Sequence, residues 1–263
     1  MKYGIRTINE ASNLRIIDDA LFRLIASRKD VCQEILRTLL DDDNLVVEDV
    51  IVQAREVSLN RELILDALCR LGDNTICNVE MQKTDFNNDV KRVRFHASLL
   101  TSNHTPRNAN FKDIPNVKIL YITEYDVLGN NQAVTHISRC QLKGKTYTPI
   151  DDGEDIIFAN ANSKQRNRHT RLLKLFLRSD SFNDNMYPAL SKAMQHFKDS
   201  EKGRDEVCKS IEEFANDRGI DTAINICIAH NDSLEETITY VTEQFTNATR
   251  DYISSRYNVL SAK

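Results

Sequence analysis

The chain has 263 residues, with 41% hydrophobic and 28% charged side chains, a composition typical of a globular protein with a sizeable core. No segment reaches the roughly 20 apolar residues of a membrane-spanning helix, and residues 1–6 lack the apolar run of a secretory signal, so we expect a cytoplasmic protein without a membrane partner. The net charge of −4 provides no overall attraction for nucleic acid, so any contact with DNA requires a local basic patch.

The first third of the chain predicts helices followed by strands. Apolar side chains recur at helical spacing from 18 to 40, with a break at 27–29, which predicts two helices. Residues 45–52 are typical of a first strand, and residues 63–68 and 76–82 of two more. Only a short turn segment separates the last two strands, so we expect them to form an antiparallel hairpin.

The turn of this hairpin determines which residues face each other. Residues 72–74, Gly-Asp-Asn, supply turn chemistry, and a hairpin centred on them places Asp66 directly opposite Glu80. Like charges in such a pair destabilise a sheet, which a fold tolerates where a cation binds between them. Gln82 lies two residues beyond Glu80 and therefore on the same face as both carboxylates. The hairpin thus gathers three polar groups on one face.

The cysteines predict reduced thiols rather than a metal centre. They include no CxxC pair and no histidine at zinc-ligand spacing, so a structural zinc site is not expected. The hairpin register places Cys69 opposite Cys77, on the face away from the two acids, where both are expected to be small core residues. The six cysteines are Cys32, Cys69, Cys77, Cys140, Cys208 and Cys227.

The middle of the chain predicts a mixed sheet. Asp85 is placed to cap a helix over 86–100, and residues 117–122 are typical of a buried strand. Shorter strands are expected at 133–139 and 156–158. Because helices and strands alternate here, we expect an α/β fold with a mixed sheet flanked by helices. The buried stripe of the helix is expected to comprise Val90, Val93, Ala97 and Leu100.

A basic amphipathic helix is predicted over residues 164–178. Its charged face could neutralise DNA phosphates and give salt-sensitive binding without sequence preference. The alternative is that these cations face water or an acidic neighbouring subunit. The cations are Lys164, Arg166, Arg168, Arg171, Lys174 and Arg178.

Only helical patterning follows residue 184, with interruptions expected at 218–219 and 231–233. We therefore expect two units, a core over 1–180 and a small all-helical region over 181–263. Assembly of identical chains into an oligomer is compatible with this organisation.

An ordered set of segments resembles a known nuclease family. Residues 18–23, Asp-Asp-Ala-Leu-Phe-Arg, precede the Asp66 strand, the Glu-Met-Gln strand at 80–82 and the helix over 92–100. Across residues 14–175 this set resembles the PD-(D/E)XK nuclease superfamily and, within it, the PD-(D/E)XK nuclease family transposases, or recombination-promoting nucleases. The resemblance implies a restriction-endonuclease-like α/β core.

The resemblance also implies a site for Mg²⁺ or Mn²⁺. Asp66 and Glu80 are the implied carboxylate ligands, together with the backbone carbonyl of Met81. The alternative is a solvated hairpin face with two ordinary acids. Asp19 is implied to be the helix acid that reaches the metal through water. Asp18 is the alternative, and a helix charge favoured by the dipole is a third interpretation.

Gln82 stands where the wider superfamily has lysine, although glutamine is common in the resembling family. An amide carries no positive charge and can only orient water or phosphate. The cationic role is therefore assigned to Lys91, Arg92 or Arg94 on the following helix, unless these residues form a solvated polar face. His96 is expected to be a hydrogen-bonded structural residue rather than a proton-transfer group.

The resemblance implies a magnesium-dependent DNA endonuclease, a hydrolase of phosphodiester bonds acting in DNA recombination. The alternative is a catalytically weak or inactive nuclease-fold protein that acts in DNA binding or in oligomeric interaction. Binding of a divalent metal at Asp66 and Glu80 discriminates between them, because an inactive scaffold has no use for two repelling carboxylates.

Overall fold

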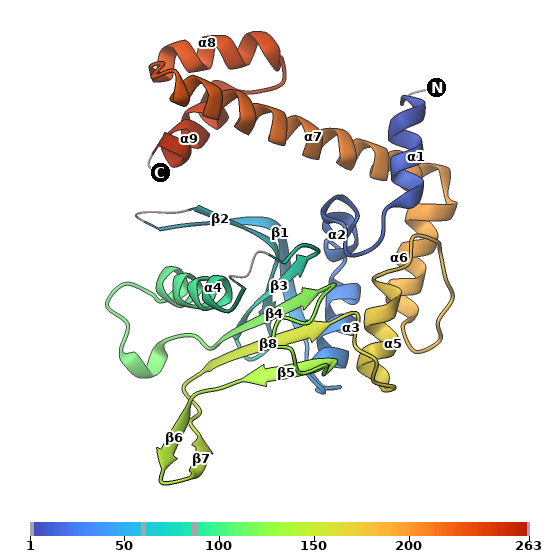
Figure 1. Cartoon of the computed structure of the whole chain (residues 1–263), viewed down its shortest axis with the longest axis vertical. Helices are drawn as coiled ribbons and strands as arrows, with labels where there is room; N and C mark the ends of the chain where they lie inside the picture. Colours follow the sequence, from blue (N-terminus) through green and yellow to red (C-terminus); the bar gives the residue numbers. More distant parts are fainter. Residues whose placement is uncertain (1–2, 59–61, 86–88, 262–263) are drawn as a thin grey trace.

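A six-stranded mixed sheet forms the centre of the protein, in a computed structural model that describes residues 3–58, 62–85 and 89–261 (Figure 1). Its strand order is β1-β2-β3-β4-β8-β5, with β3, β4 and β8 parallel and the remaining neighbours antiparallel. The mixed sheet predicted from the sequence is confirmed. Its strands are β1 (Val47–Val57), β2 (Glu62–Leu71), β3 (Ile76–Gln82), β4 (Val117–Thr123), β5 (Val134–Ile137) and β8 (Glu154–Asn160).

Helices cover both faces of the sheet (Figure 1). Helix α4 packs on one face, and α2, α3, α5 and α6 pack on the other, with α1 beside them. The predicted break near 27–29 is confirmed, because α2 ends at Ala26 and α3 begins at Lys29. These helices are α1 (Ile5–Asn13), α2 (Asp19–Ala26), α3 (Lys29–Leu39), α4 (Asp89–His104), α5 (Arg168–Leu175) and α6 (Pro188–Asp199), and Phe111–Asp113 form the 3₁₀ turn η1.

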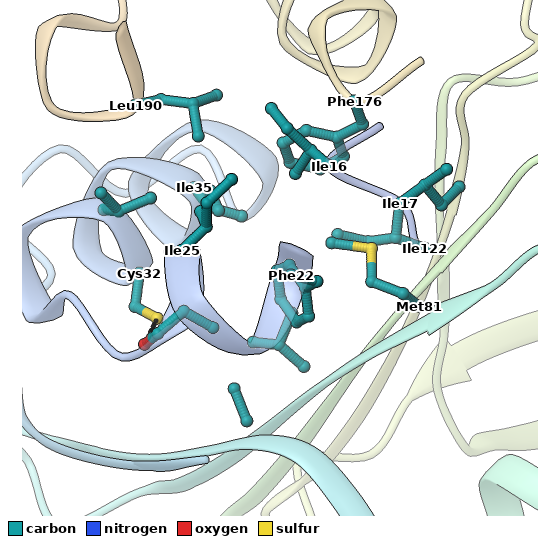
Figure 2. Close-up of a cluster of buried hydrophobic side chains, with 14 of the residues drawn as sticks. Ile16, Ile17, Phe22, Ile25, Cys32, Ile35, Met81, Ile122, Phe176 and Leu190 are labelled. Carbon is teal, nitrogen blue, oxygen red and sulfur yellow. Dashed lines mark hydrogen bonds between the residues drawn. The ribbon is translucent and has the colours of Figure 1, made fainter. Parts of the chain in front are cut away.

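The larger core lies between the sheet and the layer that contains α2 and α3. Phe22 and Ile25 of α2 are almost fully buried there, as is Ile17 just before this helix. Figure 2 shows the Met81 side chain of β3 beside Ile17 and Ile122 of β4, on the side of the sheet where α2 lies. Because successive strand residues alternate faces, Met81 on this side directs its two neighbours, Glu80 and Gln82, to the opposite side.

The C-terminal region is helical, as predicted, and comprises α7 (Glu201–Ala229), α8 (Leu234–Gln244) and α9 (Arg250–Ser261). The interruption expected at 218–219 is wrong, because α7 continues through Gly219. A Cβ atom at this position would lie only 2.8 Å from the ring of Phe245, so glycine allows the segment after α8 to approach α7 closely. No helix among the described residues is long and apolar enough to cross a bilayer.

Helix α7 belongs to two hydrophobic clusters. Val207, Cys208 and Ile211 in its first half pack in the main core, whereas Ile220 and Ile224 pack against α8 and α9. The two halves of this continuous helix therefore pack against different parts of the protein. The division of the chain at residue 180 stays a prediction.

Two expected helices differ in detail. The expected start of α4 at residue 86 lies outside the described residues. The prediction that Val90 belongs to the buried stripe of this helix is wrong, because Val90 is 55% exposed. The first turn of α4 instead buries Asp89. The basic helix is shorter than 164–178, because α5 begins after its N-cap, Asn167, whose side chain accepts a hydrogen bond from Thr170 N.

The hairpin of β6 (Cys140–Lys143) and β7 (Thr146–Pro149) was not predicted. All of its strand residues are exposed, so no alternation of apolar and polar side chains marks it in the sequence. Figure 1 shows this hairpin projecting from the β5 and β8 edge of the sheet.

Candidate active site

The β2–β3 hairpin has the register predicted from its turn. The amide of Asn74, whose φ is 65°, donates to the Leu71 carbonyl oxygen at 2.9 Å and closes the turn. Cys69 pairs with Cys77 across the strands, and both are buried free cysteines. The prediction that these two residues face each other is confirmed.

Asp66 and Glu80 lie one position beyond the last ladder pair, in the same register. The Asp66 side chain replaces the missing ladder contact, because the Met81 amide donates to Asp66 Oδ2 at 2.8 Å. Asp66 is therefore held by the backbone of β3 at the residue next to Glu80, which keeps the two carboxylates close together.

Both carboxylates are costly to ionise where they lie. Glu80 is only 3% exposed, and burial, reinforced by the charge of Asp66, raises its pKa well above its usual range. Burial is also the main cause that raises the pKa of Asp66 to about 7, and the charge of Asp19 adds to it. A cation bound between the two carboxylates would favour their charged forms and offset this cost.

Two buried residues, Asn78 and His96, contact the Glu80 carboxylate. Asn78 Nδ2 donates to Glu80 Oε1 at 2.9 Å, and His96 Nδ1 of α4 lies 3.6 Å from the same oxygen. Asn78 and His96 are at most 1% exposed. They are therefore placed to fix the side-chain conformation of Glu80.

The two aspartates at the start of α2 have different surroundings. Asp18 is the N-cap residue, accepts a hydrogen bond from the Arg15 amide at 2.6 Å and forms an ion pair with Lys83. Asp19 is exposed, and its charge raises the pKa of Asp66. Of the two aspartates, Asp19 is the one coupled to the acidic pair.

Arg92 is the helix cation that reaches the site. Its Nη1 donates to Gln82 Oε1 at 3.3 Å, and Gln82 Nε2 donates to the Thr84 carbonyl oxygen at 2.9 Å. The positive charge of Arg92 lowers the pKa of both Asp66 and Glu80 against the larger effect of burial. Its neighbours Lys91 and Arg94 are exposed on α4.

A family model described as PD-(D/E)XK nuclease family transposase matches residues 18–200. The chain belongs to this family. The match includes the whole sheet and the acidic hairpin, and with the observed topology it establishes a restriction-endonuclease-like α/β fold. Comparisons with curated proteins and with solved structures found no match. Residues 201–263 lie outside the match to the PD-(D/E)XK nuclease family transposases.

In this PD-(D/E)XK family member, a polar cluster that sequence reasoning missed anchors the helix of Arg92. Asp89 is 5% exposed and accepts hydrogen bonds from the hydroxyls of Tyr121 at 2.7 Å and Tyr125 at 3.0 Å. Tyr121 is the β4 neighbour of Glu80. The cluster therefore fixes the first turn of α4 against the strand next to the acids. No sequence signal connects Asp89 with tyrosines more than 30 positions away.

The basic segment before and within α5 has acidic partners in the same chain. Arg168 pairs with Asp41 at 2.9 Å and with Asp43 at 3.1 Å, and Arg171 pairs with Asp184 at 2.9 Å. Lys164 is exposed ahead of the helix. Contact of Lys164, Arg168 and Arg171 with DNA stays a prediction.

Within the described residues, no three Asp, Glu, His or Cys side chains are grouped closely enough to hold a metal ion. The structure brings two carboxylates together, and the charge of Asp19 acts on Asp66. This arrangement matches the preference of Mg²⁺ for one or two protein carboxylates, with water completing its coordination.

Proposed function

We propose that this PD-(D/E)XK family member is a magnesium-dependent DNA endonuclease that hydrolyses phosphodiester bonds. The observation that carries the proposal is the pair formed by Asp66 and Glu80, a half-buried and a buried carboxylate on neighbouring strands, with Asp66 held by the amide of Met81, the residue next to Glu80. A purely structural hairpin gains nothing from two repelling acids in this position, because like charges across a sheet are destabilising.

The donor atoms fit Mg²⁺, or Mn²⁺ in its place. Asp66 and Glu80 would hold the ion with the carbonyl oxygen of Met81, all of them the hard oxygen donors that Mg²⁺ prefers. Asp19 would act through water. The raised pKa of each carboxylate reflects an electrostatic cost that a divalent cation removes. When bound, Mg²⁺ supplies Lewis acidity toward the scissile phosphate and the attacking water.

The protein's own side chains bind and orient the substrate. Arg92 presents a guanidinium that suits the planar, charged oxygens of a phosphodiester. Gln82 carries no charge, and its contact with Arg92 helps to hold that guanidinium at the acidic pair. Arg92 thereby takes the role that lysine has in the wider superfamily.

Plasmid cleavage by the purified protein tests the proposal. We expect nicked or linear DNA in Mg²⁺ and none in EDTA, together with a Mg²⁺-dependent rise in the melting temperature, because a ligand that binds only the folded state stabilises it. Duplex binding without cleavage, and with no effect of Mg²⁺ on melting, would favour the alternative of an inactive nuclease-fold protein.

We expect Arg92→Gln to lower the cleavage rate about 100-fold, since removing one group that stabilises transition-state charge costs roughly 10²–10³. Gln82→Ala should cost only about 10-fold, because its hydrogen bond to the Thr84 carbonyl oxygen is neutral and the bond that it accepts from Arg92 is long, at 3.3 Å. Single-turnover cleavage at saturating Mg²⁺ measures both rates.

The control for charge is Lys145→Gln on the exposed β6–β7 turn, which should cleave at the wild-type rate. The double variant Gln82→Lys with Arg92→Gln returns a cation to the site and should recover part of the lost activity. Equal rates for Arg92→Gln and Lys145→Gln would refute the role of Arg92.

A further inference from the structure

Helix α7, which lies outside the family match, is fixed across the active-site end of the core by two anchors (Figure 1). The first joins it to α2, because the buried hydroxyl of Ser210 donates to the Ala20 carbonyl oxygen at 2.8 Å. Ala20 is the residue next to Asp19.

The second anchor joins α7 to the strand that carries Asp66. Arg256 of α9 donates from Nε to Asp221 Oδ1 of α7 at 2.7 Å and also forms an ion pair with Glu62, the first residue of β2. Arg256 and Glu62 are both buried in this contact. The stretch of α7 between the two anchors is therefore held near the acids of α2 and β2.

Arg218 lies in this stretch, and it shares the aromatic ring of Phe214 with Arg23. Its guanidinium lies 5.7 Å from the centre of the Phe214 ring, and that of Arg23 from α2 lies 6.0 Å from the same centre. Arg23 also donates to Gln53 Oε1 of β1 at 2.9 Å. Both guanidinium groups thus lie near one ring, whose electron-rich face attracts cations.

These two charges lie within electrostatic reach of the acids. Both Arg218 and Arg23 lower the pKa of Asp19 against the larger effect of burial, and Arg23 has the same effect on Asp66. Arg218 is exposed, so its guanidinium is available to a ligand. With Arg92 on α4, cations from three helices act on the acids of the site.

We propose that Arg218, supported by Arg23 across Phe214, binds a backbone phosphate of the DNA substrate beside the cleaved bond, so that the C-terminal helices complete the substrate cleft. The proposal rests on the proposed nuclease function. A protein with a net charge of −4 needs a local basic surface to bind DNA, and Arg218 and Arg23 would supply part of it. Arginine suits the role because its planar guanidinium pairs with two phosphate oxygens at once.

Binding of a short fluorescent DNA duplex, measured by anisotropy over a range of salt concentrations with Ca²⁺ in place of Mg²⁺, tests the proposal. We expect Arg218→Gln to weaken binding about 10-fold and to lower the slope of log K against log salt by about 1, the effect of losing one phosphate contact. Arg218→Lys should keep the slope. Lys209→Gln is the matched control, because Lys209 precedes Arg218 by nine residues and lies on the opposite side of α7.

Each outcome separates this inference from the proposed function. If Arg218→Gln bound DNA with the affinity and salt slope of the wild type, the inference would be overturned and the nuclease function would remain. The same would follow if Lys209→Gln lost as much affinity as Arg218→Gln. Weaker binding in Arg218→Gln alone, combined with a wild-type protein that does not cleave, would support the phosphate contact and refute the nuclease. A wild-type protein that does not bind duplex DNA would overturn both. An unchanged melting temperature and an unchanged Mg²⁺-induced shift in Arg218→Gln would show that fold and metal site are intact.

Discussion

Asp66→Asn is expected to abolish magnesium-dependent cleavage and at the same time to stabilise the metal-free protein. Cleavage should fall at least about 100-fold, because a lost ligand is more damaging than the 10–100-fold loss seen for residues that only support ligands. The asparagine oxygen can still accept the hydrogen bond that Met81 N gives to Asp66 at 2.8 Å, so the hairpin should remain intact. The Mg²⁺-induced rise in melting temperature should disappear.

The stabilisation should depend on pH. The pKa of Asp66 is about 7 in the folded protein and near 3.8 when unperturbed, so between these values the folded state keeps a proton that the unfolded chain has lost. Wild-type stability therefore falls as the pH rises through this window, whereas asparagine does not titrate. The advantage of Asp66→Asn should be absent below about pH 4 and complete above about pH 7, reaching roughly 1–3 kcal/mol.

Urea unfolding of the metal-free proteins at pH 4 and pH 8 measures this difference. The control for the Asp66→Asn variant is Asp73→Asn. A hydrogen bond from the Thr75 amide lowers the pKa of Asp73, so the charged form of Asp73 stabilises the folded state. Asp73→Asn should therefore lose a little stability at pH 8 and gain none. A large loss of stability in Asp66→Asn with cleavage unchanged would show that Asp66 is a structural residue.

Arg256→Met is expected to cause the largest loss of stability, about 3 kcal/mol, because the buried carboxylate of Glu62 then keeps only its ion pair with Arg55. The side chains of Arg256 and Glu62 are only 8% and 4% exposed. The melting temperature should fall by roughly 2–4 °C for each kcal/mol lost. The change also removes the anchor between the C-terminal helices and β2.

Two further variants test the cause of this loss. Arg250→Met breaks an ion pair with Glu235 whose side chains are 62% and 67% exposed, so it should cost less than about 1 kcal/mol. Adding Glu62→Gln to Arg256→Met removes the buried charge that has lost Arg256 and should restore part of the stability. If Arg256→Met were as harmless as Arg250→Met, the buried ion pair would not hold the C-terminal helices in place.

The sequence determined the β2–β3 hairpin, because all the information needed is local. The turn residues at 72–74 and the alternation of side chains fix a register in which Cys69 faces Cys77, and the same register brings Asp66 to Glu80. The observed strand β3 has the predicted limits, 76–82. The break between α2 and α3 was equally local. The proximity of Asp66 and Glu80 therefore follows from the hairpin alone.

Only the tertiary structure decided which distant groups meet this hairpin. Three cations on the following helix were equivalent in the sequence, and the packing of α4 brings Arg92 to Gln82. Gly219 is a second example. Its low helix propensity favours a break, but the residue lies inside α7, where the absence of a side chain leaves room for the ring of Phe245. The stretch of α7 that carries Arg218 is held against α2 and β2 by anchors at Ser210 and Arg256. Such contacts depend on how helices cross the sheet, and neither spacing nor periodicity along one chain records that geometry.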